Sequence, residues 1–375
     1  MNSDVLIIGG GVIGLSIARE LHKKGIGRIT IVERGKMGQE ASFAAAGMLA
    51  PDAETDKIDD FYHFCSESKR LYPDLASELF NETGVNIELD RSGTLYLAFT
   101  ESDSIELKKS LEWKLRACLQ VDYLNAEETR KWEPFVSPDI RESLFFAEDW
   151  QVENRKLLAA LIKYSRINGI RIYEQTEIRE LLIKNNLVTG AAQDKVKFFA
   201  GTTILTTGAW TSLIKIRETT VPVKVKPIRG QMISFHPPEK LFQKVIFSPR
   251  GYIVPRADGR ILTGATVEDV GFDKSTTEIG TAKLHDIASE IAPCLAGITI
   301  SDKWAGLRPF AGEGQPIIGG IEGFENLMIA TGHYRNGILL APLTGKIISE
   351  KLCENKHSKY LQAFSPKSIS PFLQH

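Results

Sequence analysis

The chain has 375 residues, of which 43% are apolar and 25% charged, and its formal net charge is −1. This length exceeds what one simple core needs and predicts two domains, with the composition of a soluble globular protein. The balanced charge argues against nucleic acid or an anionic membrane as the main partner, and no apolar run approaches the ~20 residues that span a bilayer.

The four cysteines lie far apart, with no C-x-x-C pair and no spacing typical of metal ligands; they are Cys65, Cys118, Cys294 and Cys353. They are therefore interpreted as reduced thiols, which predicts a cytoplasmic protein without a metal site. Residues 5–15 are apolar but follow no basic stretch, so we do not expect them to act as a signal sequence.

The first predicted element is a buried strand over residues 5–8, followed by three glycines in the G-x-G-x-x-G spacing. Gly9 permits a tight turn, Gly11 lets the backbone approach a pyrophosphate, and Gly14 lets the next helix pack closely on the strand. That helix begins at Val12 and Ile13, where its free N–H groups and positive dipole end attract phosphate.

A second strand over residues 29–32 ends in Glu33, 19 residues after Gly14. An acid at this place accepts a hydrogen bond from the ribose of an adenosine. Strand, glycines, helix and acid together predict a bound dinucleotide rather than an empty βαβ unit. These residues alone leave NAD and FAD equally open.

Small residues dominate from 41 to 47. They suit either a backbone that passes close to a flat, bulky group or a tightly packed, alanine-rich helix start. The next expected elements are a helical stretch over 58–80 that is interrupted at Pro73, a strand over 94–99 and an exposed helix over 101–118.

The second half of the chain alternates between helices and strands. Helices are predicted over 155–168, 277–291 and 338–352, and strands over 170–174, 178–183, 196–199, 202–206, 304–309 and 327–330, with mainly β structure from 221 to 267. Ligands of open α/β sheets bind at the carboxyl ends of strands. We therefore expect the site at the loops after Ile8, Leu205 and Ala330.

Six motifs, taken in order, resemble the glycine oxidase branch of the D-amino acid oxidase-like flavoproteins over nearly the whole chain. They are the glycine motif with Glu33 and the stretches 44–49, 251–256, 264–266, 304–309 and 332–339. The resemblance selects FAD. Sarcosine oxidases tether flavin to a cysteine near the place of Leu307, and this chain has no cysteine between Cys294 and Cys353, so we expect non-covalent FAD.

The fold that the resemblance implies is α/β, and α+β overall. A Rossmann-like FAD-binding domain carries an inserted, mainly antiparallel β-sheet substrate domain. The expected FAD-binding domain is discontinuous, over residues 1–85, 150–220 and 300–375, and the expected substrate-binding domain comprises 86–149 and 221–299.

The resemblance also implies a set of cofactor-binding residues. It places Glu33 and Arg34 at the adenosine ribose, Ile178 beside the adenine, and further residues along the phosphates and flavin, namely Ser42, Gly47, Met48, Leu49 and Gly208. The isoalloxazine would meet the loop of His333, Tyr334, Arg335, Asn336, Gly337, Ile338 and Leu339. A helix starting near Ile338 would aim its N-terminus at the flavin and, with Arg335, favour the anionic reduced form.

For the substrate, the resemblance implies that Arg308 binds a carboxylate, that Tyr252 donates a hydrogen bond to it, and that Arg335 assists. The alternatives are an ion pair for Arg308 and a core aromatic role for Tyr252. No side chain is expected to act as a catalytic acid or base, and His333 is either structural or a proton carrier. Two residues that depart from the pattern, Arg250 and Val267, are expected to border the pocket.

The implied reaction is oxidative deamination of glycine, and of sarcosine or small D-amino acids, by hydride transfer to flavin N5. Reoxidation by O2 yields H2O2, glyoxylate and ammonia, and the iminoacetate formed on the way feeds thiazole synthesis for thiamine. A homotetramer that binds a small amine and O2, but neither membrane nor nucleic acid, is expected. The alternatives are a sarcosine or D-amino acid oxidase, a quinone-linked amino acid dehydrogenase, and a non-catalytic dinucleotide-binding sensor.

Overall fold

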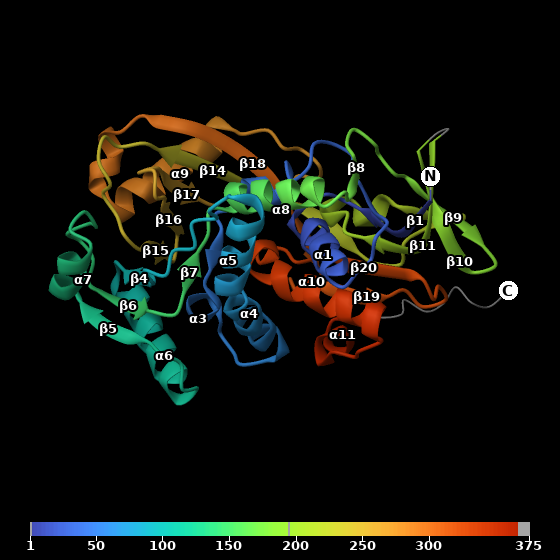
Figure 1. Cartoon of the computed structure of the whole chain (residues 1–375). Coiled ribbons are helices and arrows are strands. Elements are labelled where there is room, and N and C mark those ends of the chain that lie inside the picture. The colour runs from blue at the N-terminus through green and yellow to red at the C-terminus, as the bar shows by residue number, and fades with distance from the viewer. Residues whose placement is uncertain (1, 194–195, 367–375) are drawn as a thin grey trace.

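The computed structural model of the chain describes residues 2–193 and 196–366. Two large sheets lie next to each other, one of ten strands and one of eight, and a two-stranded ladder joins β3 (Met48–Leu49) to β7 (Trp150–Gln151). In Figure 1, β1, β9, β11 and β20 lie to the right, and β4, β6, β15 and β16 to the left. The mixed α/β arrangement confirms the predicted fold class.

The centre of the ten-stranded sheet is parallel. β1 (Asn2–Ile8) pairs with β2 (Ile29–Val32) and β11 (Val196–Leu205), and β11 pairs in parallel with β20 (Leu327–Thr331). The remaining strands are β8 (Arg171–Tyr173), β9 (Glu180–Lys184), β10 (Leu187–Gln193), β12 (Lys215–Ile216), β13 (Thr219–Thr220) and β19 (Ile317–Gly320). Because β1, β11 and β20 run the same way, their following loops meet at one edge.

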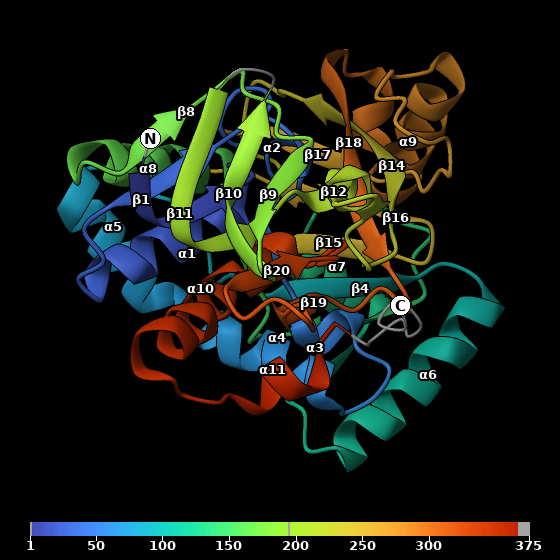
Figure 2. The ribbon, with the colours of Figure 1, turned by 90° about the vertical axis from the view of Figure 1, so that its right-hand side faces the viewer.

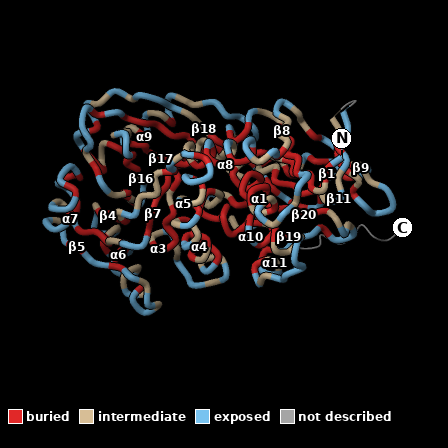
Figure 3. The backbone as a smooth tube through the Cα atoms, viewed as in Figure 1, coloured by how far each residue is buried: buried red, intermediate tan, exposed pale blue. Residues whose placement is uncertain are grey.

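One face of this sheet is covered by helices. Val5 and Ile7 of β1 share a core with α1 (Val12–Lys23), α4 (Asp60–Arg70), α5 (Tyr72–Thr83), α8 (Asn154–Ile167) and α10 (Gly337–Glu354). Leu6 and Ile8 point to the opposite face, because side chains alternate along a strand. Figure 2 shows α1 and α10 together beside the sheet, and in Figure 3 the tube through them is mostly buried.

The eight-stranded sheet is mainly antiparallel. Its order is β18 (Ile300–Ala311), β14 (Val225–Phe235), β17 (Ile261–Gly264), β16 (Gly251–Pro255), β15 (Val245–Ser248), β4 (Thr94–Ala98), β6 (Glu142–Phe146) and β5 (Asp122–Asn125). The other helices are α2 (Ala41–Ala44), α3 (Pro51–Glu54), α6 (Glu101–Arg116), α7 (Ala126–Trp132), α9 (Glu278–Ile291) and α11 (Lys359–Ala363), with 3-10 turns η1 (Gly208–Leu213) and η2 (Pro293–Gly297).

β18 and β14 are the long strands through which this sheet approaches the other one. They pair along almost their full length, from Val225 opposite Ala311 to Phe235 opposite Ile300. The predicted domain boundary at residue 300 assigns β18 to the FAD-binding part, whereas its hydrogen bonds lie in the eight-stranded sheet. A boundary drawn on the sequence cannot describe this strand. β18 pairs with β14 in the eight-stranded sheet, while its C-terminal end lines the cavity at the ten-stranded sheet.

Two local predictions differ from the structure. The strands expected over 196–199 and 202–206 are one continuous strand, β11, because Gly201 remains extended between them. The helical stretch expected over 58–80 is two helices. Pro73 lies in the first turn of α5, where its missing N–H costs no helical hydrogen bond, so the break comes before the proline.

Candidate functional site

A long cavity opens at the carboxyl ends of β1, β11 and β20. The space it encloses, its open mouth included, is about 1190 Å³. Its walls come from the glycine turn after β1, the segment that follows β2, residues 176–179, the stretch 206–214, the end of β18 and the loop before α10. The three strand-end loops predicted from the sequence therefore meet at one cavity.

The glycine turn is tight enough to exclude side chains. Gly9 has φ +112°, and a Cβ there would lie 2.4 Å from the backbone oxygen of Thr206. At Gly14 a Cβ would lie 2.1 Å from the oxygen of Gly9, so this glycine allows α1 to approach β1. Gly11 is the N-cap of α1 and, with Val12 and Ile13, lines the cavity. The first N–H groups of α1 therefore lie where a pyrophosphate could bind.

Glu33 is held in place by two backbone donors. Its carboxylate accepts hydrogen bonds from Gly10 N at 2.7 Å and Gly35 N at 2.8 Å, and the residue is 8% exposed. A carboxylate has about four acceptor positions, so further positions remain for ribose hydroxyls. The glycine turn and this oriented acid fit the adenosine half of FAD.

An aromatic and ionic cluster that the sequence reasoning missed lies at the same end of the cavity. The guanidinium of Arg34 is 3.8 Å from the centre of the Trp210 ring and 2.8 Å from Glu40. Glu40 also pairs with Lys274, which follows β17 in the second sheet, at 2.7 Å. Trp210 could have been found from the sequence, because it follows a predicted strand end and lies two residues after the predicted Gly208.

The opposite end of the cavity is formed by the start of α10, where Gly337 and Ile338 line the wall. Pro342 has no N–H for the Ile338 carbonyl, and the Tyr72 hydroxyl donates to that oxygen instead. Ser68 donates to the Leu339 carbonyl at 2.7 Å. Two helices of the sheet face therefore fix this turn, which would present its N-terminal dipole to the flavin.

His333 is buried behind that turn, at 2% exposure. Its Nε2 lies 3.2 Å from the Thr344 hydroxyl, and burial lowers the pKa of His333 to about 3. The imidazole is therefore neutral at ordinary pH. Of the two roles left open by the sequence, the geometry favours the structural one.

The predicted substrate residues come together in the second sheet, on β16 and β18, which are separated by β17 and β14. Arg308 of β18 donates to the Thr266 carbonyl at 3.0 Å. Burial lowers the pKa of Arg308, and burial raises the pKa of Tyr252 on β16 while the positive charge of Arg308 opposes that rise. Arg335 is exposed and acts electrostatically on both groups. Two cations and a phenol thus share one small region, which suits a carboxylate.

Glu54, at the end of α3, was not predicted. The residue is exposed, and the positive charges of Arg335 and Arg308 act on its carboxyl. Tyr252 experiences the charge of Glu54 in turn. Nothing in the sequence marked this residue, because α3 is a four-residue helix with no motif and its neighbours are distant in the chain.

Most predicted cofactor residues line the cavity directly: Gly9, Gly11, Val12, Ile13, Glu33, Arg34, Ser42, Ile178, Gly208, His333, Tyr334, Arg335, Gly337 and Ile338. The others form the layer around it, namely Gly14, Gly47, Met48, Leu49, Asn336 and Leu339. Met48 shares an apolar cluster with Tyr252 and Trp304. The structure thus gathers the predicted set in one region.

The two residues that depart from the family pattern lie differently from the rest. Arg250 pairs with Glu290 of α9 at 2.7 Å and with Asp103 of α6 at 3.3 Å, and Val267 is 53% exposed. Like Arg308 and Tyr252, neither is among the residues that line the long cavity. Their expected position at the pocket border rests on the resemblance.

Two features are absent from the described residues, 2–193 and 196–366. No helix there is long and apolar enough to cross a membrane. Within the same ranges, no three His, Cys, Asp or Glu side chains gather closely enough to hold a metal ion.

Comparison with known proteins gives consistent results. The family described as DAO, FAD dependent oxidoreductase, matches residues 4–351. A glycine oxidase of Pseudomonas aeruginosa is 32% identical over 351 residues, covering 93% of this chain and 94% of that protein. The crystal structure of glycine oxidase from Geobacillus kaustophilus superimposes with a TM-score of 0.91 at 32% identity, covering 98% of this chain and all of the other.

A longer relative is also similar. The bifunctional protein ThiO/ThiG of Synechocystis is 35% identical over 372 residues, which covers 97% of this chain. The chain spans only 54% of that relative's length. The similarity therefore concerns about half of the bifunctional protein.

Proposed function

The chain belongs to the DAO family of FAD-dependent oxidoreductases, and we propose that it catalyses the oxidative deamination of glycine with O2 as electron acceptor. FAD is its cofactor, and the absence of cysteine between Cys294 and Cys353 supports non-covalent binding. Sarcosine and small D-amino acids are the further substrates proposed. The products would be glyoxylate, ammonia and H2O2.

One observation carries the choice of an amino acid as substrate, namely the pairing of Arg308 with Tyr252 in one region beside the cavity. A planar guanidinium binds a carboxylate through two parallel hydrogen bonds, and a phenol adds a third donor. A cofactor-binding protein without catalysis has no need for a half-buried carboxylate clamp. The sensor alternative is therefore less well supported.

The residues of the chain would act by orientation. Arg308 and Tyr252 would fix the substrate carboxylate, which leaves the amine and Cα directed at the cofactor. The start of α10, with Arg335 next to it, would stabilise negative charge that develops on the ring system. When bound, FAD supplies the redox chemistry, taking hydride at N5 and passing the electrons to O2. His333 is neutral and buried, so no proton transfer is assigned to it.

Three wider features belong to the same proposal. Supply of an imine for the thiazole of thiamine is supported by the similarity to the ThiO/ThiG protein. A cytoplasmic location is supported by four cysteines that form no disulfide. A homotetramer is proposed on the family resemblance, and light scattering at four times the monomer mass would support it.

The decisive experiment is anaerobic titration of the purified protein with glycine while the flavin band near ~450 nm is followed, with air then admitted. Sarcosine and D-alanine are titrated in parallel. We expect glycine to bleach the band and air to restore it with formation of H2O2. The Arg308→Lys variant should need at least ~100-fold more glycine, because an ammonium cannot form the paired contact.

Other outcomes would reassign the protein. Bleaching by sarcosine or D-alanine but not glycine would place the activity elsewhere in the family. Recovery only with an added quinone would favour the dehydrogenase. A flavin that no amine reduces would contradict the oxidase and favour the sensor.

A further inference from the structure

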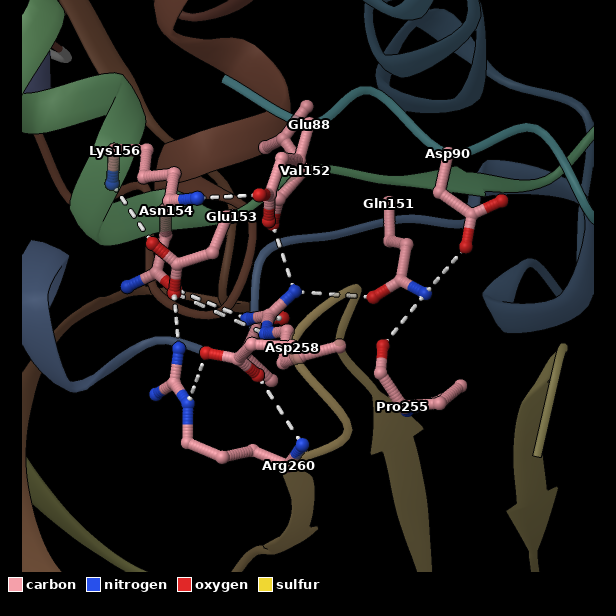
Figure 4. A network of polar contacts seen from close by, with 12 residues as sticks. Glu88, Asp90, Gln151, Val152, Glu153, Asn154, Lys156, Pro255, Asp258 and Arg260 are labelled. Carbon is pink, nitrogen blue, oxygen red and sulfur yellow. Dashed lines mark hydrogen bonds and ion pairs between the residues drawn. The ribbon is translucent and has the colours of Figure 1, made fainter. Parts of the chain in front are cut away.

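Arg256, the residue after β16, carries a buried charge for which the proposed reaction has no use. Its side chain is 2% exposed. The guanidinium donates four hydrogen bonds, from Nη1 to the Gln151 side chain at 3.0 Å and the Val152 carbonyl at 2.9 Å, and from Nη2 to the Ala46 carbonyl at 2.8 Å and the Asn154 side chain at 3.1 Å. Figure 4 shows Gln151, Val152 and Asn154 close together within one network of polar contacts.

The charge on Arg256 persists at ordinary pH. Burial lowers the pKa of Arg256 to about 10, and Glu153 lies 3.9 Å from its Nε. A buried cation with one loosely placed partner costs stability unless its donors are satisfied. The fixed fork of an arginine can satisfy several acceptors that lie in different directions at once. We therefore interpret Arg256 as the residue that bonds these four acceptors at once.

Two of these four hydrogen bonds lead to residues 42–46, one directly and one through Asn154. Arg256 holds the Ala46 carbonyl directly. Asn154, whose side-chain oxygen accepts from Arg256, donates through its amide nitrogen to the Ser42 carbonyl at 2.8 Å and the Phe43 carbonyl at 3.0 Å. The guanidinium and the amide thus fix three carbonyls within five residues.

The other side of the same segment faces the cavity, where Ala41, Ser42 and Ala45 line the wall. The Ser42 hydroxyl accepts from Val12 N at 3.1 Å, at the phosphate-binding start of α1. The segment has little room to shift, since a Cβ on Gly47 (φ +72°) would lie 2.1 Å from the Val152 carbonyl oxygen. It is therefore a thin wall between the cavity and the Arg256 network.

We propose that Arg256, acting through Asn154, is a positioning residue that holds residues 42–46 in the shape required for FAD binding. The inference rests on the proposed placement of FAD along this wall. Tyr252 lies in β16, and Arg256 directly follows that strand. The same strand therefore carries a proposed substrate residue and ends next to the residue that holds the cavity wall. The network thereby links the end of β16 to the segment that lines the cavity.

The test is the dissociation constant of FAD, measured by flavin fluorescence when protein freed of FAD is titrated. Arg256→Lys keeps the charge and loses the fork, and Asn154→Ala removes the bonds to Ser42 and Phe43. We expect at least a tenfold weaker affinity in the first and at least a threefold weaker affinity in the second. Each loaded variant should also show a shifted flavin absorption band, which a loss of stability alone would not produce.

Arg260→Ala is the matched control. Arg260 lies in the same network in Figure 4, pairs with Asp258 at 2.8 Å, and bonds to none of residues 42–46 among the described contacts. It should bind FAD within twofold of the original chain.

FAD affinities of Arg256→Lys and Asn154→Ala within twofold of the original, with unshifted bands, would overturn the inference. If the lysine variant does not fold, the alanine variant decides alone. Because FAD affinity is independent of the amine that is oxidised, a protein that binds FAD but ignores glycine would contradict only the proposed substrate.

Discussion

At the scale of single residues, the site combines groups whose charges are set by burial. His333 shows how burial sets a protonation state. The pKa of His333 is lowered to about 3 by burial, whereas in the unfolded chain it is expected near ~6.5. Between these values the unfolded chain binds a proton that the folded chain does not. Stability is therefore lost as the pH falls below the unfolded value.

This difference gives a measurable acid sensitivity. Falling from pH 7.5 to pH 5 should cost about 2 kcal/mol in the free energy of unfolding through His333 alone. His333→Gln, which does not ionise, should show a shallower pH dependence by that amount in urea unfolding curves. Parallel curves for the two proteins between pH 7.5 and pH 5 would contradict a buried, neutral histidine.

Glu54 is predicted to discriminate among substrates. Its carboxylate shares the field of Arg308 and Arg335, and a second carboxylate on the substrate would be repelled there. Glu54→Gln should therefore raise the rate of flavin reduction by D-aspartate relative to D-alanine by at least ~10-fold. Glu313→Gln, outside this field, is the control. An unchanged ratio would show that Glu54 does not face the substrate.

At the scale of elements, the pairing of β14 with β18 positions Arg308. Gly230 of β14 lies opposite Gly306, and a Cβ on Gly230 would lie 2.3 Å from Cζ and both Nη atoms of Arg308. The guanidinium therefore rests on a glycine. Gly230→Ala should displace it and raise the KM for the amine at least ~10-fold, while FAD affinity stays constant.

Gly297→Ala is the matched control for this change, because a Cβ there would meet nothing within 4 Å. An unaltered KM in Gly230→Ala, measured by steady-state peroxide formation, would mean that Arg308 can bind its ligand from another position.

The start of α10 depends on a second element. Tyr72 of α5 is fully buried, and its hydroxyl serves the carbonyl that Pro342 leaves without a helical donor. Tyr72→Phe should lower the free energy of unfolding by about 1–3 kcal/mol, because it leaves a buried acceptor unpaired. Urea unfolding measures this. Tyr173→Phe, at the sheet edge, is the control, and equal losses in the two variants would contradict the assigned role.

Local sequence patterns predict some parts of the site but not others. The turn at Gly9 and the start of α1 were predictable because local spacing demands them. Arg308 and Tyr252 could be named only through the resemblance. Their approach depends on the antiparallel register of β14, β16, β17 and β18, which no local pattern encodes. Glu54, Trp210 and Arg256 were missed as functional residues because their partners lie more than a hundred residues away.

At the scale of the whole molecule, the cavity lies where the two sheets meet. Its walls come from chain segments between residues 8 and 338, and they include the end of β18 from the second sheet. Binding there touches both sheets at once. A ligand that binds only the folded chain stabilises it by an amount that grows with the logarithm of its concentration relative to the dissociation constant.

We therefore expect bound FAD to increase the stability of the folded chain. At 100 times its dissociation constant, FAD should add about 2.7 kcal/mol to the free energy of unfolding. For a chain of 375 residues this raises the Tm of the FAD-free protein by about 3 °C. Differential scanning fluorimetry measures the shift, with equimolar NAD as the control. The glycine turn and Glu33 suit either dinucleotide, so only the walls contributed by residues 42–47 and the α10 turn can discriminate. An equal shift with NAD would contradict the assignment of those walls to the flavin.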